Sequence, residues 1–237
     1  MNKKLTFILS LTFLFLFSGS VYGDDLQDAL DALVAHNRQD YKTAHRLWLP
    51  LAEQGDKFAQ YFIKKCPWPK VIDADALKSM GFKDFQNSII TPHETELEMM
   101  LANSGKDFLI PKLREAHVKE KAEILQGNLR YFLQNNNVLL LKGPTDIIIS
   151  RNKISYNRTG NQGMTKGGTG DVLAGLAVGF LAKSQDLFKS AVAAAYLNGL
   201  VGDMLLKKKK GYSFIASDIV EDLKNIDNLA KKQKRRK

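Results

Sequence analysis

The chain has 237 residues, 44% hydrophobic and 25% charged, as is typical of a globular protein of one or two domains. Its single cysteine, Cys66, excludes an internal disulfide, and the four histidines are scattered, so no metal-binding side-chain cluster is expected. The net charge of +10 comes from two runs, Lys207–Lys210 and the tail Lys231–Lys237. This distribution favours a solvated tail over a nucleic-acid-binding or membrane-binding surface.

The first 23 residues have the pattern of a signal peptide. Lys3 and Lys4 precede an apolar run from Leu5 to Phe17, and small residues follow at Val21 and Gly23. The run is short for a membrane-spanning helix, so cleavage and export to the periplasm or outside are expected. An uncleaved membrane anchor is the alternative.

Residues 24–63 show helical spacing of apolar side chains, beginning with Leu26, Leu30 and Leu33. The segment RQDYKTAHRLWLPLAEQGDKFAQYFI resembles a single unit of the Sel-like repeats, relatives of the tetratricopeptide repeats. One unit cannot bury its own apolar face, because repeat proteins need about three stacked units. This segment is therefore predicted to be a helical fragment and not a complete domain.

From Val71 onward the pattern alternates between strands and helices. A strand is expected in VIDADAL, and a strand running into a helix in SIITPHETELEMML. Further strands are expected in NNNVLLLKGPTDIIISRNKISY, with a turn at Gly143 and Pro144. Apolar helices are predicted from Thr169 to about Lys183 and from Asp186 to about Leu206, and a further helix with Ser217 as its N-cap. The alternation predicts an α/β fold, with a mostly parallel sheet covered by helices on both faces.

Polar residues follow each of the expected strands. They are Asp73 and Asp75, then Thr91 to Glu94, then Lys142 to Asp146. Ligands bind beyond the carboxyl ends of parallel strands, so the three clusters are expected to converge on one site. Taken singly, His93 is better explained as a structural histidine, and the two aspartates equally well as a turn or helix cap. Lys142, beside a glycine, favours a phosphate contact over a solvated lysine.

The segment NRTGNQGMTKGGTGD, residues 157–171, leads directly into the helical pattern VLAGLAVGFLA. Its glycines allow close approach of bare backbone, and the N–H groups of Gly168, Thr169 and Gly170 would lie at a helix N-terminus, where anions bind. Asp171 would repel such an anion unless it has a chemical task, which favours a general base. A glycine-rich turn followed by an N-terminal helix acid is the alternative.

In this order, VIDADAL, ITPHETELEMM, LLLKGPTDIIIS and NRTGNQGMTKGGTGDVLAGL resemble the C-terminal part of the NAD(P)H-hydrate dehydratases, from about Val71 to about Asn225. The resemblance implies a ribokinase-like three-layer αβα sandwich over residues 71–228, followed by a basic tail, residues 229–237. It also implies ADP or ATP with Mg²⁺ as cofactors, and dehydration of NADHX and NADPHX to NADH and NADPH. A small-molecule kinase of the same superfamily is the alternative function.

The resemblance also implies roles for individual residues. The hydrated nicotinamide would lie beside the catalytic base Asp171 and the segment His93–Met99, including Glu94 and Glu96. Asp171 would deprotonate the ring hydroxyl, which attacks the terminal phosphoryl group, and the phosphorylated oxygen then leaves as phosphate. The nucleotide would contact the following residues: Lys142, Gly143, Pro144, Thr145, Asp146, Asn161, Gly167, Gly168, Thr169 and Gly170.

Complete members of the family carry more than a hundred residues before the VIDADAL strand, including the first strands of the sheet. We therefore expect an N-terminally truncated domain with an open sheet edge and an uncovered apolar face. The signal peptide implies export, whereas nucleotide chemistry implies the cytoplasm. An inactive exported fragment is a third hypothesis, and homo-oligomerisation is left open.

Overall fold

The computed structural model describes residues 68–208, 211–224 and 226, together with Asp31, Val34, Ala35, Arg38 and Thr43. The predicted signal peptide, most of the predicted repeat fragment and the basic tail lie outside the described residues. The chain divides into two compact units, Met1–Cys66 and Pro67–Lys237. The fold described below belongs to the second unit.

A five-stranded sheet with the order β1-β2-β3-β4-β5 forms the centre of this unit. The strands are β1 Lys70–Ile72, β2 Ser88–Ile90, β3 Val138–Leu141, β4 Asp146–Ile149 and β5 Ile154–Asn157. Strands β1, β2 and β3 are parallel, whereas β3–β4 and β4–β5 pair antiparallel.

The sheet is therefore less parallel than the sequence pattern predicted. The β3–β4 and β4–β5 connections, residues 142–145 and 150–153, are four-residue hairpin turns. A parallel crossover needs a connection of about a dozen residues or more, so such short turns can only join antiparallel strands. The turn expected at Gly143 and Pro144 is confirmed, and it is this turn that reverses the chain.

Long and short helices connect and cover the strands. The longer ones are α6 Glu94–Asn103, α8 Val118–Asn128, α10 Thr169–Ser184, α11 Leu187–Lys208 and α12 Ala216–Leu223. The shorter ones are α5 Asp75–Lys78, α7 Ile110–Glu115 and α9 Arg130–Gln134, with single 3₁₀ turns η1 Phe82–Asp84, η2 Asp107–Leu109 and η3 Gln162–Met164. Among the described residues, no helix combines the length and apolar character needed to cross a membrane.

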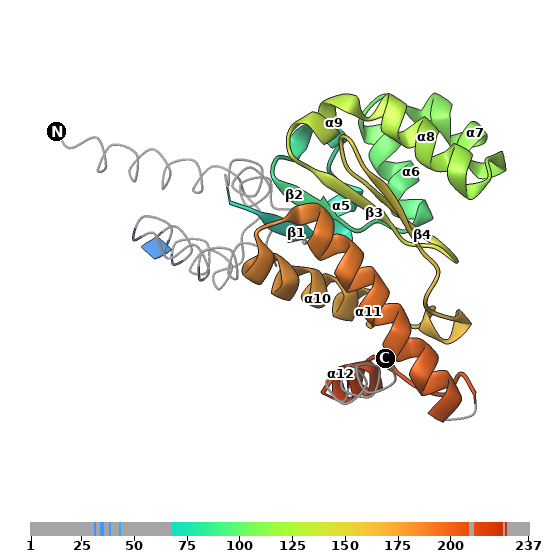
Figure 1. Cartoon of the computed structure of the whole chain (residues 1–237). Helices are drawn as coiled ribbons and strands as arrows, with labels where there is room; N and C mark the ends of the chain where they lie inside the picture. The colour runs from blue at the N-terminus through green and yellow to red at the C-terminus, as the bar shows by residue number, and fades with distance from the viewer. Residues whose placement is uncertain are drawn as a thin grey trace, which may run out of the picture. The chain divides into compact units, whose positions relative to one another are not determined.

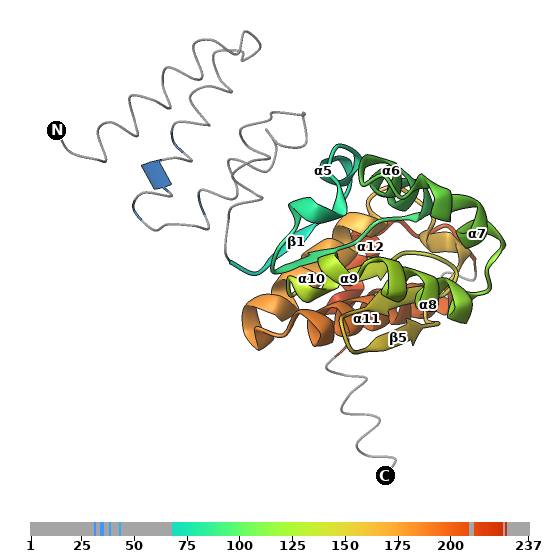
Figure 2. The same cartoon turned by 90° about the horizontal axis from the view of Figure 1, so that it is seen from above.

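These elements form three layers. Helices α10 and α11 lie on one face of the sheet, and α6, α8 and α9 lie on the other (Figures 1 and 2). Every residue of β1, β2 and β3 is buried, as expected for strands covered on both faces. The core on the α10–α11 side joins strand residues such as Ile89 and Leu140 to helix residues such as Ala177 and Ala194. The predicted αβα layering is confirmed.

Helix α12 begins slightly earlier than predicted. Its N-cap is Ile215, whose N–H donates to Asp218 Oδ2 at 2.8 Å. Ser217 lies inside the first turn, so its predicted role as the N-cap is wrong. The acid three residues after the cap satisfies the exposed N–H at this helix start, and a serine hydroxyl is not required there.

Candidate functional site

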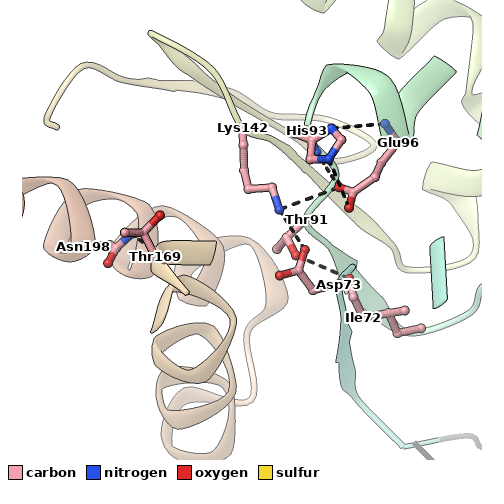
Figure 3. A network of polar contacts seen from close by, with 8 residues as sticks. All are labelled: Ile72, Asp73, Thr91, His93, Glu96, Lys142, Thr169 and Asn198. Atoms are coloured by element: carbon pink, nitrogen blue, oxygen red, sulfur yellow. Dashed lines mark hydrogen bonds and ion pairs between the residues drawn. The ribbon is translucent and has the colours of Figure 1, made fainter. Parts of the chain in front are cut away.

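The polar residues that follow β1, β2 and β3 converge at one edge of the sheet (Figure 3). The Lys142 ammonium, after β3, lies 2.9 Å from Asp73 Oδ1, after β1. It also lies 3.7 Å from Glu96 Oε2, in the first turn of the helix that follows β2. The Asp73 and Glu96 side chains are only 12% and 6% exposed, so the single lysine balances two largely buried carboxylates. The predicted convergence is confirmed for Asp73 and Lys142, and the residue that joins them from the chain after β2 is Glu96, two residues beyond the predicted cluster Thr91–Glu94.

His93 begins helix α6 in a capping box. Its N–H donates to Glu96 Oε2 at 2.8 Å, and its Nδ1 accepts from the Glu96 N–H at 3.2 Å. Two N–H groups at the helix start are thereby satisfied, and the structural explanation of His93 is confirmed. Glu94 forms an ion pair with Lys121 of α8, apart from the Lys142 cluster. Asp75 lies in the first turn of α5, after Ala74.

The N-terminus of α10 lies against the same cluster. A Cβ built on Gly170 would be 3.6 Å from Lys142 Nζ and 3.7 Å from Asp73 Oδ2, so this backbone faces the ion pair directly. Gly168, the N-cap, has φ 86°, a left-handed conformation that favours glycine. Thr169 is buried, and its hydroxyl donates to the carbonyls of Met164 and Lys166 at 2.6 and 2.9 Å.

Asp171 is exposed in the first turn of α10, directly after Gly170. The helix dipole stabilises a carboxylate there, and the side chain is accessible to an incoming hydroxyl group. The positive end of a 16-residue helix, a lysine and an accessible carboxylate therefore occupy one edge of the sheet. This combination can bind an anion and accept a proton next to it.

The KGPTD turn between β3 and β4 is organised by Asp146. Its Oδ1 accepts from the Gly143 N–H at 3.1 Å, and its Oδ2 accepts from Asn157 Nδ2 at 2.9 Å. Burial raises the pKa of the Asp146 carboxyl, and the bonds from Asn157 and Gly143 partly offset that rise. Gly143 and Pro144 are exposed and Thr145 is half-buried. The turn therefore presents backbone to solvent beside Lys142.

The loop between β5 and α10 lies along helix α11. Asp203 of α11 accepts from the Gly160 N–H and from Asn161 Nδ2, both at 3.0 Å. Asn161 Oδ1 in turn accepts from the Gly163 N–H at 3.0 Å. Asn198 of α11 is 6% exposed, and its Nδ2 donates to the Thr169 carbonyl at 3.4 Å (Figure 3). Its Oδ1 has no hydrogen-bond partner among the described residues.

The structure thus divides the predicted site residues into two groups. Lys142, Gly170 and Glu96 gather at the sheet edge, with Asp171 following Gly170 along the chain. Asn161 and Asp146 are engaged in holding their own loops, and Gly167 faces open space. Lys166, in the glycine-rich loop, bonds to the Tyr212 and Phe214 carbonyls.

Sequence reasoning missed the residues of α11 that hold the glycine-rich loop. They are Asn198, Gly199, Gly202 and Asp203. A usable signal was present, because two glycines three residues apart, followed by an acid, are out of place in an otherwise apolar helix interior. The segment AAAYLNGLVGDMLL was instead interpreted only as a buried helix.

Comparison with known proteins gives a consistent result. A family model described as NAD(P)H-hydrate dehydratase matches residues 49–225, starting upstream of the Val71 boundary expected from the motifs. The bifunctional NAD(P)H-hydrate repair enzyme Nnr of Methanocaldococcus jannaschii is 38% identical over 172 residues, covering 71% of this chain and 30% of that protein. The ADP-dependent (S)-NAD(P)H-hydrate dehydratase of Cenarchaeum symbiosum is 34% identical over 157 residues, covering 65% of this chain and 50% of that protein.

Solved structures share the fold. The ADP/ATP-dependent NAD(P)H-hydrate dehydratase of Bacillus subtilis, co-crystallised with ATP/Mg²⁺, matches with a TM-score of 0.58 and 24% identity, over 74% of this chain and 60% of that one. A ribokinase-like superfamily protein of Enterococcus faecalis matches with a TM-score of 0.53 and 24% identity, over 71% and 57%. The predicted ribokinase-like fold is confirmed, and the chain spans half or less of the two curated relatives described above. The chain belongs to the NAD(P)H-hydrate dehydratase family.

Proposed function

We propose that this chain carries out the nucleotide-dependent dehydration of NADHX and NADPHX to NADH and NADPH. The observation that carries the proposal is the position of Gly170. Its bare backbone, at the N-terminus of α10, faces Lys142 and Asp73 at the carboxyl edge of the sheet, and Asp171 follows it directly. The name of the Cenarchaeum symbiosum relative, an ADP-dependent dehydratase, supports the same reaction.

In this proposal the nucleotide phosphates lie at the start of α10. The N–H groups of Gly168, Thr169 and Gly170 and the helix dipole hold the terminal phosphoryl group, and Lys142 adds a full positive charge. Gly167 and the turn Gly143–Asp146 line the rest of the nucleotide path, with Asn161 in the loop beneath. Such donors act strongly because they are fixed before charge develops on the transferred group.

Asp171 takes the proton from the hydroxyl of the hydrated nicotinamide ring. The hydroxyl oxygen forms a bond to the terminal phosphorus, and the bond to the nucleotide's bridging oxygen breaks. The phosphorylated oxygen then leaves with its bonding electrons as phosphate, and the neighbouring ring carbon gives up a proton to solvent as the double bond re-forms. Glu96 and His93 flank this substrate. Glu94 acts indirectly, because its ion pair with Lys121 links α6 to α8.

The residues at this edge also fit a magnesium ion that arrives with the nucleotide. The described residues contain no group of three histidine, cysteine or acidic side chains that could hold a metal. Mg²⁺ on a nucleotide keeps phosphate and water ligands and needs only one or two carboxylates. Asp73 directs Oδ2 toward Gly170 and would supply one of them. When bound, the ion would neutralise charge on the transferred phosphoryl group.

The test is recovery of the near-ultraviolet absorbance of reduced nicotinamide from NADHX, with ADP or ATP and Mg²⁺. Replacement Asp171→Asn should lower the rate by about 10²–10⁴-fold, the usual contribution of a general base. Asp186→Asn, which alters a half-buried acid just before α11, is the matched control and should leave the rate unchanged. An Asp171→Asn enzyme with full activity would remove Asp171 from the mechanism.

The products decide between this reaction and a kinase of the same superfamily. Free phosphate formed together with NADH supports the dehydratase, whereas a stable phosphorylated alcohol would show a kinase. Absence of nucleotide binding by calorimetry would favour the inactive fragment.

Export by the predicted signal peptide would separate this site from cytoplasmic nucleotides, so we propose that the active form acts in the cytoplasm.

A further inference from the structure

The glycine-rich loop lies on bare helix backbone. A Cβ on Gly199 of α11 would be 2.3 Å from Thr159 Oγ1 and 2.4 Å from the Thr159 carbonyl oxygen. A Cβ on Gly202, one turn further along, would be 2.3 Å from Met164 Sδ. Contacts this short do not occur, so Thr159 and Met164 of the loop touch α11 where a side chain is missing.

Hydrogen bonds fix the loop along the same stretch of α11. Thr159 Oγ1 donates to the Tyr196 carbonyl at 3.0 Å, and Asn157 Nδ2 donates to the Ala195 carbonyl at 3.1 Å. Asp203 uses both of its carboxylate oxygens on the loop, one for Gly160 and the other for Asn161. The loop is therefore held from residue 157 to residue 164 by one face of α11, residues 195–203.

The contacts of Asn161 assign it a role different from ligand binding. Its Nδ2 donates a hydrogen bond to Asp203 Oδ1, and its Oδ1 accepts one from the Gly163 N–H in the turn η3. Both polar atoms of the Asn161 amide therefore already have partners within the fold, although Nδ2 keeps a second hydrogen. These bonds favour a role for Asn161 in shaping the backbone that leads to Gly168 and Thr169.

Resting on the proposed function, we propose that the 195–203 face of α11 sets the glycine-rich loop in its anion-binding shape before any nucleotide arrives. Asp203 and Asn161 are the positioning residues of this arrangement. The carboxylate of Asp203 is held by loop donors, so its negative charge is directed at N–H groups and not at the bound phosphates. Nucleotide affinity then depends on a hydrogen-bonded pair that does not itself touch the nucleotide.

A polarity swap in the full-length chain tests the pair. Asn161→Asp places two carboxylates opposite each other, and Asp203→Asn places two amide groups there. The double variant Asn161→Asp/Asp203→Asn restores an acceptor for Gly160, one for Gly163 and a bond between the two side chains. Each single variant should bind ADP with Mg²⁺ at least about tenfold more weakly, and the double variant should recover to within about threefold of wild type.

A second readout needs no ligand. Hydrogen exchange of the Gly160 and Gly163 amides should be slow in the free wild-type chain, faster in both single variants and slow again in the double variant. Gly199→Ala should also speed exchange in the loop and weaken ADP binding. Gly179→Ala, in α10, is its matched control, because an added Cβ there meets nothing within 4 Å.

The outcomes separate this inference from the proposed function. Wild-type protein that binds no nucleotide, but shows the expected exchange pattern, contradicts the function and supports the positioning pair. Effects that multiply in the double variant would show that Asn161 or Asp203 contacts the nucleotide directly and would overturn the inference. Loop exchange and ADP affinity unchanged in all variants would overturn it as well.

Discussion

Replacement of Lys142 by methionine tests the charge balance at the sheet edge. The substitution keeps most of the side-chain volume and removes the ammonium that lies 2.9 Å from Asp73 and 3.7 Å from Glu96. Two carboxylates, 12% and 6% exposed, then lose their counter-charge. Removing one member of a buried ion pair typically costs about 3–5 kcal/mol, because the remaining charge is poorly solvated.

The loss of unfolding free energy in Lys142→Met should lie near the lower end of that range. The Lys142 side chain is 20% exposed, so water partly screens the site before and after the substitution. We therefore expect Lys142→Met to lower the free energy of unfolding by about 3 kcal/mol. In a domain of this size, such a loss lowers the melting temperature by about 6–12 °C.

Urea unfolding followed by far-ultraviolet circular dichroism measures this change, with a lower midpoint and an unchanged slope. The matched control is Lys189→Met, which breaks an ion pair with Asp186 whose side chains are 75% and 36% exposed. That variant should lose no more than about 1 kcal/mol. Adding Asp73→Asn to Lys142→Met should recover part of the loss. The reasoning is refuted if Lys142→Met is no less stable than Lys189→Met.

Two further predictions concern parts that support the site. Asn137 is 1% exposed and bonds to the Ser88 N–H and to the Phe85 and Phe132 carbonyls, so Asn137→Ala should cost about 3 kcal/mol or more in urea unfolding. Asn128→Ala, at an exposed helix end, should cost under about 1 kcal/mol; equal losses would contradict the prediction. Because burial raises the pKa of Asp146, its ionisation opposes folding, and wild type should gain stability relative to Asp146→Asn as pH falls toward 3.8. Unfolding titrations at several pH values measure this difference, and a difference independent of pH would refute it.

The sequence predicted the main elements because their signals are local. The apolar runs VLLL and DIII and the long apolar stretches after Gly170 and Asp186 need only neighbouring residues to be read as strands and helices. The convergence of Asp73 and Lys142 also followed from a local fact, since each comes directly after a strand. The wrong N-cap at Ser217 shows the limit of this approach, because an acid three residues beyond the cap competes with a serine as the capping group.

The roles of individual polar residues were harder to predict. The family resemblance implied a nucleotide contact for Asn161, and Asp203 was assigned no role from the sequence. In the structure they bond to each other across 42 residues of sequence. His93 was favoured as a structural histidine, and the structure supplies the reason, a capping box with Glu96 three residues later.

The sequence by itself determined the family, the αβα layering and the existence of an anion-binding helix start followed by an acid. These rest on residue types at short spacing, whose backbone preferences act locally. Only the tertiary structure decided which charge balances which, and what holds the glycine-rich loop. Lys142 meets Asp73 across 69 residues, and Gly160 meets Asp203 across 43. Such pairings depend on how strands and helices pack in space, and no local pattern encodes them.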